Sequence, residues 1–167
     1  MKTRILLSLI FLTIFFSCQE NEEVSPYAKM EGRWEQIFDV NGLYEGYHIF
    51  EFKEDGTYIG EMAARTLDTK ELIGYRGIEE GLYVINENKI TLTRTKAFSR
   101  DVNDPSFVDD NSPFPTFVPK DALIPDNRPQ EIYYWIADDF SELRFICPEN
   151  SADYCVEFTT YVKVTNP

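Results

Sequence analysis

Short segments in which apolar and polar residues alternate recur along the chain downstream of Tyr27. Alternation with a period of two residues predicts β-strands, because successive side chains of a strand point to opposite faces of a sheet. No stretch keeps a helical period over two turns. The expected strands are GRWEQIFDV, YHIFEF, TYIGEMAA, GLYVI, ITLTRT, EIYYWIA, LRFIC and YCVEFTTYVKV.

Turn residues separate these segments in a way that favours hairpins. Asn41-Gly42 suits a tight two-residue turn, and KEDG, NENK and DDFSE lie between later strands. About eight antiparallel strands with one apolar face each are therefore expected. A barrel buries that face and leaves no sheet edge exposed, so we predict an all-β antiparallel barrel. Patterning alone leaves a β-sandwich of similar strand number as the alternative.

The same alternation predicts which side chains face the barrel interior. Aromatic residues are 15% of the chain, which suits a cavity for a flat or acyl ligand. They suit equally well a barrel that is filled by its own side chains. The expected inward residues are His48, Phe50, Phe52, Tyr58, Met62, Tyr83, Ile85, Ile90, Leu92 and Phe158, and all but Ile90 and Phe158 are our candidates for ligand contacts.

A proline-rich insert at about residues 98–129 interrupts the strands. Its six prolines exclude a helix or a central strand, whereas apolar residues such as Phe114, Phe117 and Ile124 argue against a solvated linker. The segment EIYYWIA that follows is apolar on both faces. We therefore predict that residues 114–124 pack on the outer face of that strand or fold over the barrel mouth as a lid.

The chain begins with a short positively charged region, Lys2 and Arg4, followed by an apolar run from Ile5 to Phe16. The run is too short to span a membrane and ends in small residues, which is typical of a secretory signal peptide. The sequence FFSC resembles the lipobox of bacterial lipoproteins, in which the cysteine is lipidated and becomes the mature N-terminus. The resemblance implies a signal peptide at 1–17 and a lipid on Cys18. The alternative is an ordinary signal cleaved elsewhere, with Cys18 a spare thiol.

Residues 18–28 carry no hydrophobic period and are expected to form a flexible acidic tether before the domain at 29–167. The acidic start resembles the export signal of some Gram-negative lipoproteins, which implies an outer-membrane lipoprotein exposed at the cell surface; a periplasmic orientation stays open. The formal net charge of −13 argues against nucleic acid as a partner. Contact with the membrane is therefore expected only through the N-terminal lipid.

Two further cysteines, Cys147 and Cys155, are predicted to form a disulfide in this oxidising compartment. Closing so small a loop would contribute ~2.5 kcal/mol to stability. Simple alternation places the two sulfurs on opposite faces of a hairpin. The bridge therefore requires a bulge or a strand that ends before Cys147, and Pro148 favours such an early end.

The residues Gly32-Arg33-Trp34 resemble the G-x-W start of lipocalins. FEFKEDGTY, GLYVINENKITLT and SELRF are similar to hairpins of the lipocalin-like domains of bacterial lipoproteins, so that the resemblance covers most of residues 29–165. It implies an eight-stranded up-and-down barrel, closed near Trp34 and open at the other end. It also implies a basic residue from a late strand stacked on Trp34, and Arg144 and Lys163 both qualify.

The sequence offers little for catalysis. His48 is the one histidine, there is no G-x-S-x-G motif, and no pair of ligands has zinc spacing. The acidic segment from Asp101 to Asp110 contains oxygen ligands but lacks the glycine and terminal glutamate of an EF-hand. We therefore expect no enzyme, no cofactor and no metal site. The predicted function is an envelope lipoprotein that binds a small hydrophobic ligand, and the alternative is a filled barrel that binds an envelope protein.

Lipidation of Cys18 is directly testable. Growing the producing cells with a palmitate analogue should label the wild-type protein, because the lipobox cysteine receives acyl chains, and should leave Cys18→Ser unlabelled. The label is read on a gel after chemical ligation to a fluorophore. Equal labelling of both proteins would contradict the assignment.

Overall fold

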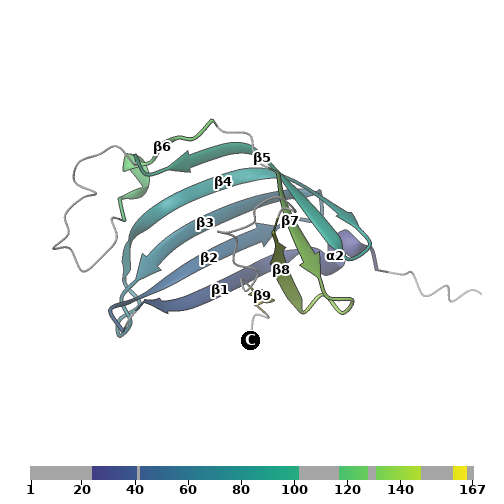
Figure 1. The fold of residues 1–167 in the computed structure, drawn as a ribbon, viewed down its shortest axis with the longest axis horizontal. Coiled ribbons are helices and arrows are strands. Elements are labelled where there is room, and N and C mark those ends of the chain that lie inside the picture. The colour runs from purple at the N-terminus through teal and green to yellow at the C-terminus, as the bar shows by residue number, and fades with distance from the viewer. Residues whose placement is uncertain (1–23, 41, 102–116, 128–130, 148–159, 165–167) are drawn as a thin grey trace, which may run out of the picture.

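The computed structural model describes residues 24–40, 42–101, 117–127, 131–147 and 160–164. Within them one antiparallel sheet curves and closes on itself (Figure 1). The predicted signal peptide and Cys18 lie outside the described residues. The strands are β1 (Gly32–Val40), β2 (Tyr44–Phe52), β3 (Thr57–Arg65), β4 (Leu72–Asn86), β5 (Lys89–Ser99), β6 (Ile124–Pro125), β7 (Glu131–Ile136), β8 (Glu142–Ile146) and β9 (Thr160–Lys163).

The order of strands confirms the predicted up-and-down barrel. Each strand from β1 to β5 pairs with the next, β5 continues to β7, and β7, β8 and β9 lead back to β1. Eight strands thus form the barrel, and the short β6 is an additional strand at the far end of β5. All neighbours in the ring are antiparallel, and β1 to β5 follow one another closely in sequence, so short turns connect these strands.

The strands of the barrel differ in length, and this makes its two ends different. β5 pairs with β4 from Lys89 to Ser99 but with β7 only from Lys89 to Thr93. At one end all eight strands contribute to the wall, and at the other the long strands β1–β5 extend beyond the short strands β7–β9 (Figure 1). We call these the closed end and the mouth.

Most strand predictions are confirmed, and the largest difference concerns β4. The expected strand GLYVI forms only the second part of a 15-residue strand that begins at Leu72. Its first part contains two glycines and several charged residues, which gave it the composition of a loop. Those residues form a strand because their partners on β3 and β5 satisfy the backbone hydrogen bonds over the whole length.

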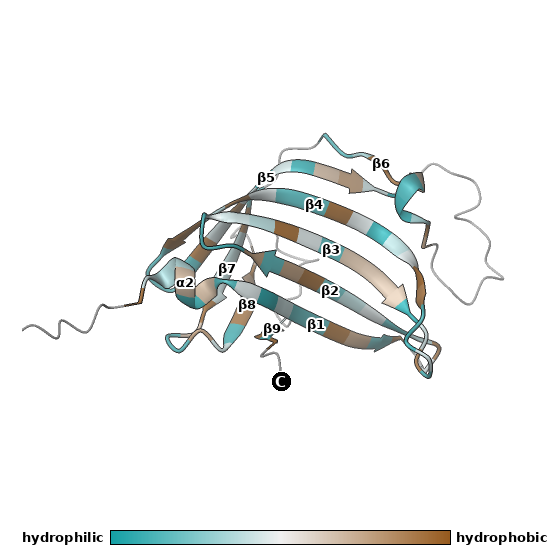
Figure 2. Cartoon of the chain, turned by 180° about the vertical axis from the view of Figure 1, so that it is seen from behind, coloured by the Kyte–Doolittle hydropathy of each residue, from teal (hydrophilic) through white to brown (hydrophobic). Residues whose placement is uncertain are grey.

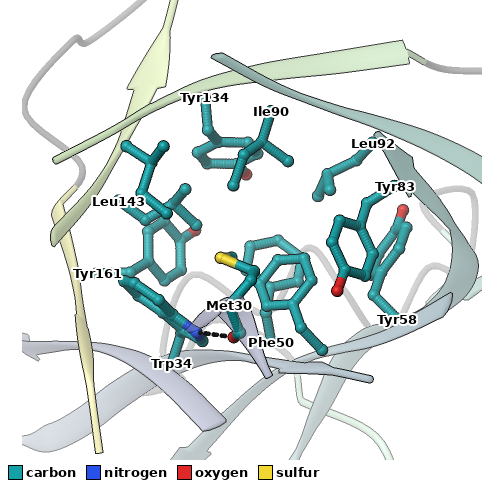
Figure 3. Packing of buried hydrophobic residues seen from close by; sticks show 12 residues of the cluster. Met30, Trp34, Phe50, Tyr58, Tyr83, Ile90, Leu92, Tyr134, Leu143 and Tyr161 are labelled. Atoms are coloured by element: carbon teal, nitrogen blue, oxygen red, sulfur yellow. Dashed lines mark hydrogen bonds between the residues drawn. The ribbon is translucent and has the colours of Figure 1, made fainter. Parts of the chain in front are cut away.

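The hydrophobic core fills the closed end. Figure 3 shows aromatic and aliphatic side chains from opposite walls pointing toward one another there. The predicted inward orientation is confirmed for the buried members of the expected set, and Ile85 packs against the core from a partly buried position. These buried members are Phe50, Phe52, Tyr58, Tyr83, Ile90 and Leu92.

The short helix α2 (Pro26–Met30) covers the closed end. Ser25 caps it by accepting a hydrogen bond from the Ala28 N–H at 3.0 Å, and Met30 is completely buried in the core. The Trp34 Nε1–H donates to the Met30 carbonyl oxygen at 2.9 Å (Figure 3). The prediction of a flexible tether up to residue 28 is therefore wrong for its last residues, which this cap and this burial hold in a helix.

The basic partner of Trp34 is Lys163. Its Nζ lies 5.9 Å from the centre of the indole ring and donates to the Lys29 carbonyl oxygen at 2.6 Å. The other candidate, Arg144, lies instead over Trp135 at 5.2 Å. Lys163 thus joins the last strand to the first strand and to the helix that covers them.

The described part of the insert lies at the mouth. Phe117 packs edge-on against Tyr44 with ring centres 5.4 Å apart, and Val118 exchanges backbone hydrogen bonds with Tyr75. A 3-10 turn (Lys120–Ala122) and β6 then follow the end of β5. This agrees with a lid at the mouth; Phe114 lies outside the described residues.

The outer face of β7 is covered differently from what we expected. Arg144 lies over Trp135, and the Lys89 ammonium lies 4.2 Å from the ring centre of Tyr133. Basic side chains from neighbouring strands therefore cover these rings, as cation–π contacts allow on an exposed surface.

Strand β8 ends at Ile146, so the predicted end before Cys147 is confirmed. Cys147 is disulfide-bonded. Its predicted partner Cys155 lies outside the described residues, so the pairing of these two cysteines stays a prediction.

The hydrogen bond between Trp34 and Met30 should be visible in stability. Trp34→Phe keeps a buried ring but leaves the Met30 carbonyl without its donor, which should lower the free energy of unfolding by about 1–3 kcal/mol. Trp135→Phe is the matched control on the outer surface and should change the free energy of unfolding by less than about 1 kcal/mol. Urea unfolding followed by circular dichroism measures both. Equal losses would show that the hydrogen bond under the closed end contributes little.

Candidate functional site

A cavity of about 350 Å³ lies above the core, on the side of the mouth. Residues from the five strands β2, β3, β4, β5 and β7, the residue after β5 and the segment after β6 form its wall. It is lined by His48, Gly60, Met62, Arg76, Gly77, Ile78, Glu79, Arg94, Ala97, Phe98, Ser99, Arg100, Asp126 and Ile132.

A buried ion pair occupies the base of this cavity. The Glu79 carboxylate accepts from Arg94 Nε at 2.8 Å and lies 2.5 Å from Arg94 Nη2, while its other oxygen accepts from the Tyr58 hydroxyl at 3.2 Å. Asp126 Oδ2 lies 3.9 Å from Arg94 Nη1. A carboxylate that is only 8% exposed needs such partners, because an unpaired buried charge costs several kcal/mol.

Gly60 makes room for this pair. It is the partner of Glu79 across β3 and β4, and a Cβ at its position would lie 2.8 Å from Glu79 Cγ and 3.0 Å from Phe50 Cε1. Any side chain at position 60 would therefore displace either the carboxylate or the central ring of the core. The glycine therefore allows the ion pair to pack directly against the aromatic rings of the core, which form the floor of the cavity.

His48 forms the opposite wall and belongs to a chain of hydroxyl groups. A hydrogen bond joins the hydroxyl groups of Tyr134 and Tyr161, and the Tyr161 oxygen lies 2.6 Å from His48 Nδ1. We assign the hydrogen of this second contact to Tyr161, so that the phenol donates and Nδ1 accepts. The neutral ring then carries its proton on Nε2.

The electrostatics of the site follow from burial. Burial and the nearby Arg94 charge lower the pKa of His48 to about 4. Burial raises the pKa of Tyr134, Tyr161 and Tyr58 well above the usual range, and for Tyr58 the Glu79 charge adds to it. At neutral pH the imidazole of His48 and the phenols of these three tyrosines are therefore uncharged.

The structure divides the predicted ligand residues into two groups. His48 and Met62 line the cavity. The remaining candidates lie below it, where Tyr83 donates to the Lys53 carbonyl oxygen at 2.7 Å and the others pack against one another. A contact between a ligand and this second group stays a prediction. This second group, below the cavity, consists of Phe50, Phe52, Tyr58, Tyr83, Ile85 and Leu92.

Sequence reasoning missed the charged residues of the site. Counting back by twos from Tyr83 places Glu79 on the inward face of β4, and counting forward from Ile90 places Arg94 on the inward face of β5. Opposite charges at inward positions of two neighbouring strands are the signal that would have identified them. Arg76, Arg100 and Asp126 carried no such signal.

Within the described residues, no helix is long and apolar enough to cross a membrane. The same part of the chain contains no cluster of three or more His, Cys, Asp and Glu residues that could hold a metal ion.

The low pKa of His48 predicts how stability depends on pH. Between pH 4 and 6.5 the unfolded chain binds a proton at His48 that the folded protein does not, so the free energy of unfolding falls as the pH is lowered through this range. His48→Gln keeps polar groups at this position but does not titrate. Between about pH 7 and pH 5 the wild type should lose about 1–2 kcal/mol more than this variant in urea unfolding. Parallel pH profiles would mean that His48 titrates normally in the fold.

Comparison with known proteins gives no match: no family model, no curated protein and no solved structure is similar to this chain.

Proposed function

We propose that this protein is a lipid-anchored protein of the bacterial cell envelope whose lipocalin-like barrel binds a small hydrophobic molecule at the mouth. The anchoring part rests on the lipobox-like FFSC and the apolar run before it. The binding part rests on the closed eight-stranded barrel and on the cavity that its long strands enclose.

The cavity is the observation that carries the proposal. Its volume of about 350 Å³ lies within the 300–1,000 Å³ that are typical of small-molecule sites, near the lower limit. Met62 and Ile132 give it apolar walls, and polar and charged side chains from several strands converge on it. A concave site in which polar groups converge beside apolar walls can both bind and orient a small molecule.

The alternative function, binding of an envelope protein, would use the outer surface. Ile37, Ile59, Leu82 and Val84 are exposed there. They do not form one patch, because charged neighbours separate them: Ile59, for example, lies between Glu51 and Glu80 in the sheet. Figure 2 shows hydrophobic and hydrophilic residues mixed along β1–β4. Scattered apolar residues of this kind are common on soluble surfaces, so the ligand-binding proposal is favoured.

Filling the cavity tests the proposal. The protein purified from its producing cells should carry a non-covalent small molecule in native mass spectrometry, and organic extraction should release it. Met62→Trp places a larger side chain in the cavity and should remove most of the bound mass. Ile37→Trp, on the outer face of β1, is the matched control and should retain it.

Thermal unfolding of each variant establishes that it is folded before its ligand content is compared. A wild-type protein that carries no small molecule and takes up none from a mixture of fatty acids, sterols, haem and aromatic dyes would contradict the proposed function and favour the protein-binding alternative.

A further inference from the structure

One side of the cavity is rich in arginine, although the protein as a whole has a net charge of −13. Arg76, Arg94 and Arg100 all line it. The acidic residues of the lining are Glu79 and Asp126, both close to Arg94. The described lining therefore has three cationic and two anionic side chains, an excess of one cationic side chain.

The excess charge lies at the rim. Arg100 donates its backbone N–H to the Arg76 carbonyl oxygen at 3.2 Å, so the two arginines are neighbours on β4 and at the end of β5. Burial and the nearby charge of Arg76 both lower the pKa of Arg100. Arg100 has further interactions within the protein, whereas Arg76 is exposed and forms no ion pair among the residues described.

A β-bulge directs Arg76 toward the cavity. The register of β3 and β4 pairs Met62 with Gly77 and Ala63 with Tyr75, so Arg76 is the extra residue between them. Regular alternation would place it on the opposite face from Gly77. Bulges commonly redirect a side chain at a functional site, and here the redirected side chain is the rim cation.

The wall across from the arginines offers a hydrogen-bond donor. His48 uses Nδ1 to accept from Tyr161, so its Nε2–H is the group left for a ligand in the cavity that it lines. Met62, the cross-strand partner of both His48 and Gly77, lies between this donor and the bulge. Donors from two sides and one excess positive charge match a monovalent planar anion, because a carboxylate accepts from both directions.

We propose that the ligand is an amphipathic monocarboxylate, with its carboxylate held by His48 and the rim arginines and its apolar part against Met62 and Ile132. This inference rests on the proposed function and adds the chemical class of the ligand. His48 and Arg76 become residues that determine specificity, and the Glu79–Arg94 pair holds the floor beneath them.

Three probes of equal chain length separate the contribution of the head group from that of the apolar part. Decanoate, decanol and decylammonium are titrated into the wild-type protein by isothermal calorimetry at neutral pH. Decanoate should bind roughly ten- to hundredfold more tightly than decanol, as expected for charge-assisted hydrogen bonds, and decylammonium should bind most weakly.

Two variants with one control locate the head group. Arg76→Gln should weaken decanoate binding by roughly tenfold and leave decanol binding unchanged. Arg33→Gln removes the same charge from the exposed outer face of β1 and should change neither. His48→Phe should weaken decanoate more than His48→Gln does, because only the glutamine retains an N–H donor, and decanol binding reports whether the cavity stays intact.

The outcomes separate the two proposals. Equal affinities of the wild type for decanoate and decanol, or equal effects of Arg76→Gln and Arg33→Gln on decanoate, would overturn the carboxylate assignment and leave the hydrophobic site in place. Binding of none of the three probes by the folded wild type would overturn the carboxylate site together with the proposed function.

Discussion

The ring of Phe50 packs against aromatic side chains from β3, β7 and β9 as well as from its own strand. This contact across the barrel fills the space between opposite walls, and water-free packing of this kind supplies most of the stability that a small barrel has. Because the closed end is solid, the cavity can exist only above it, where the long strands continue past the short ones. The core therefore decides the position of the site as well as the stability of the fold.

The buried ion pair depends on this aromatic floor. Tyr58 connects the two, since its ring packs edge-on against Phe50 and its hydroxyl donates to Glu79. A buried carboxylate–guanidinium pair is seldom more stabilising than apolar residues of the same volume. Its presence under a cavity is easier to understand as preorganisation. Glu79 holds the Arg94 side chain in place, and the Arg94 charge contributes to the electrostatic potential of the cavity. The side chain of Arg94 therefore loses no further conformational freedom when a ligand binds.

Alternation and turn residues were sufficient to predict most of the strands and the apolar side chains of the core, because both depend on local geometry. They could not predict which inward residues would line a cavity, since this depends on how far the short strands β7–β9 extend along the barrel. Phe50 and His48 have the same parity on β2, yet the first is core and the second is part of the site. Nor could they place Arg76, because a bulge changes the parity of the residues around it.

The two tryptophans show the same limit in another way. Arg144 and Lys163 have equal charge and both lie on late strands, so composition and parity did not distinguish them as the partner of Trp34. The strand pairing does: Lys163 is the cross-strand neighbour of Trp34, and Arg144 is the neighbour of Trp135. Directly opposed residues of an antiparallel pair are the ones whose side chains meet, so each ring receives its cation from the facing position. The inner pair joins the last strand to the first at the closed end, whereas the outer pair covers an exposed ring. The cation that contacts each tryptophan can therefore be assigned only when the register of the paired strands is known.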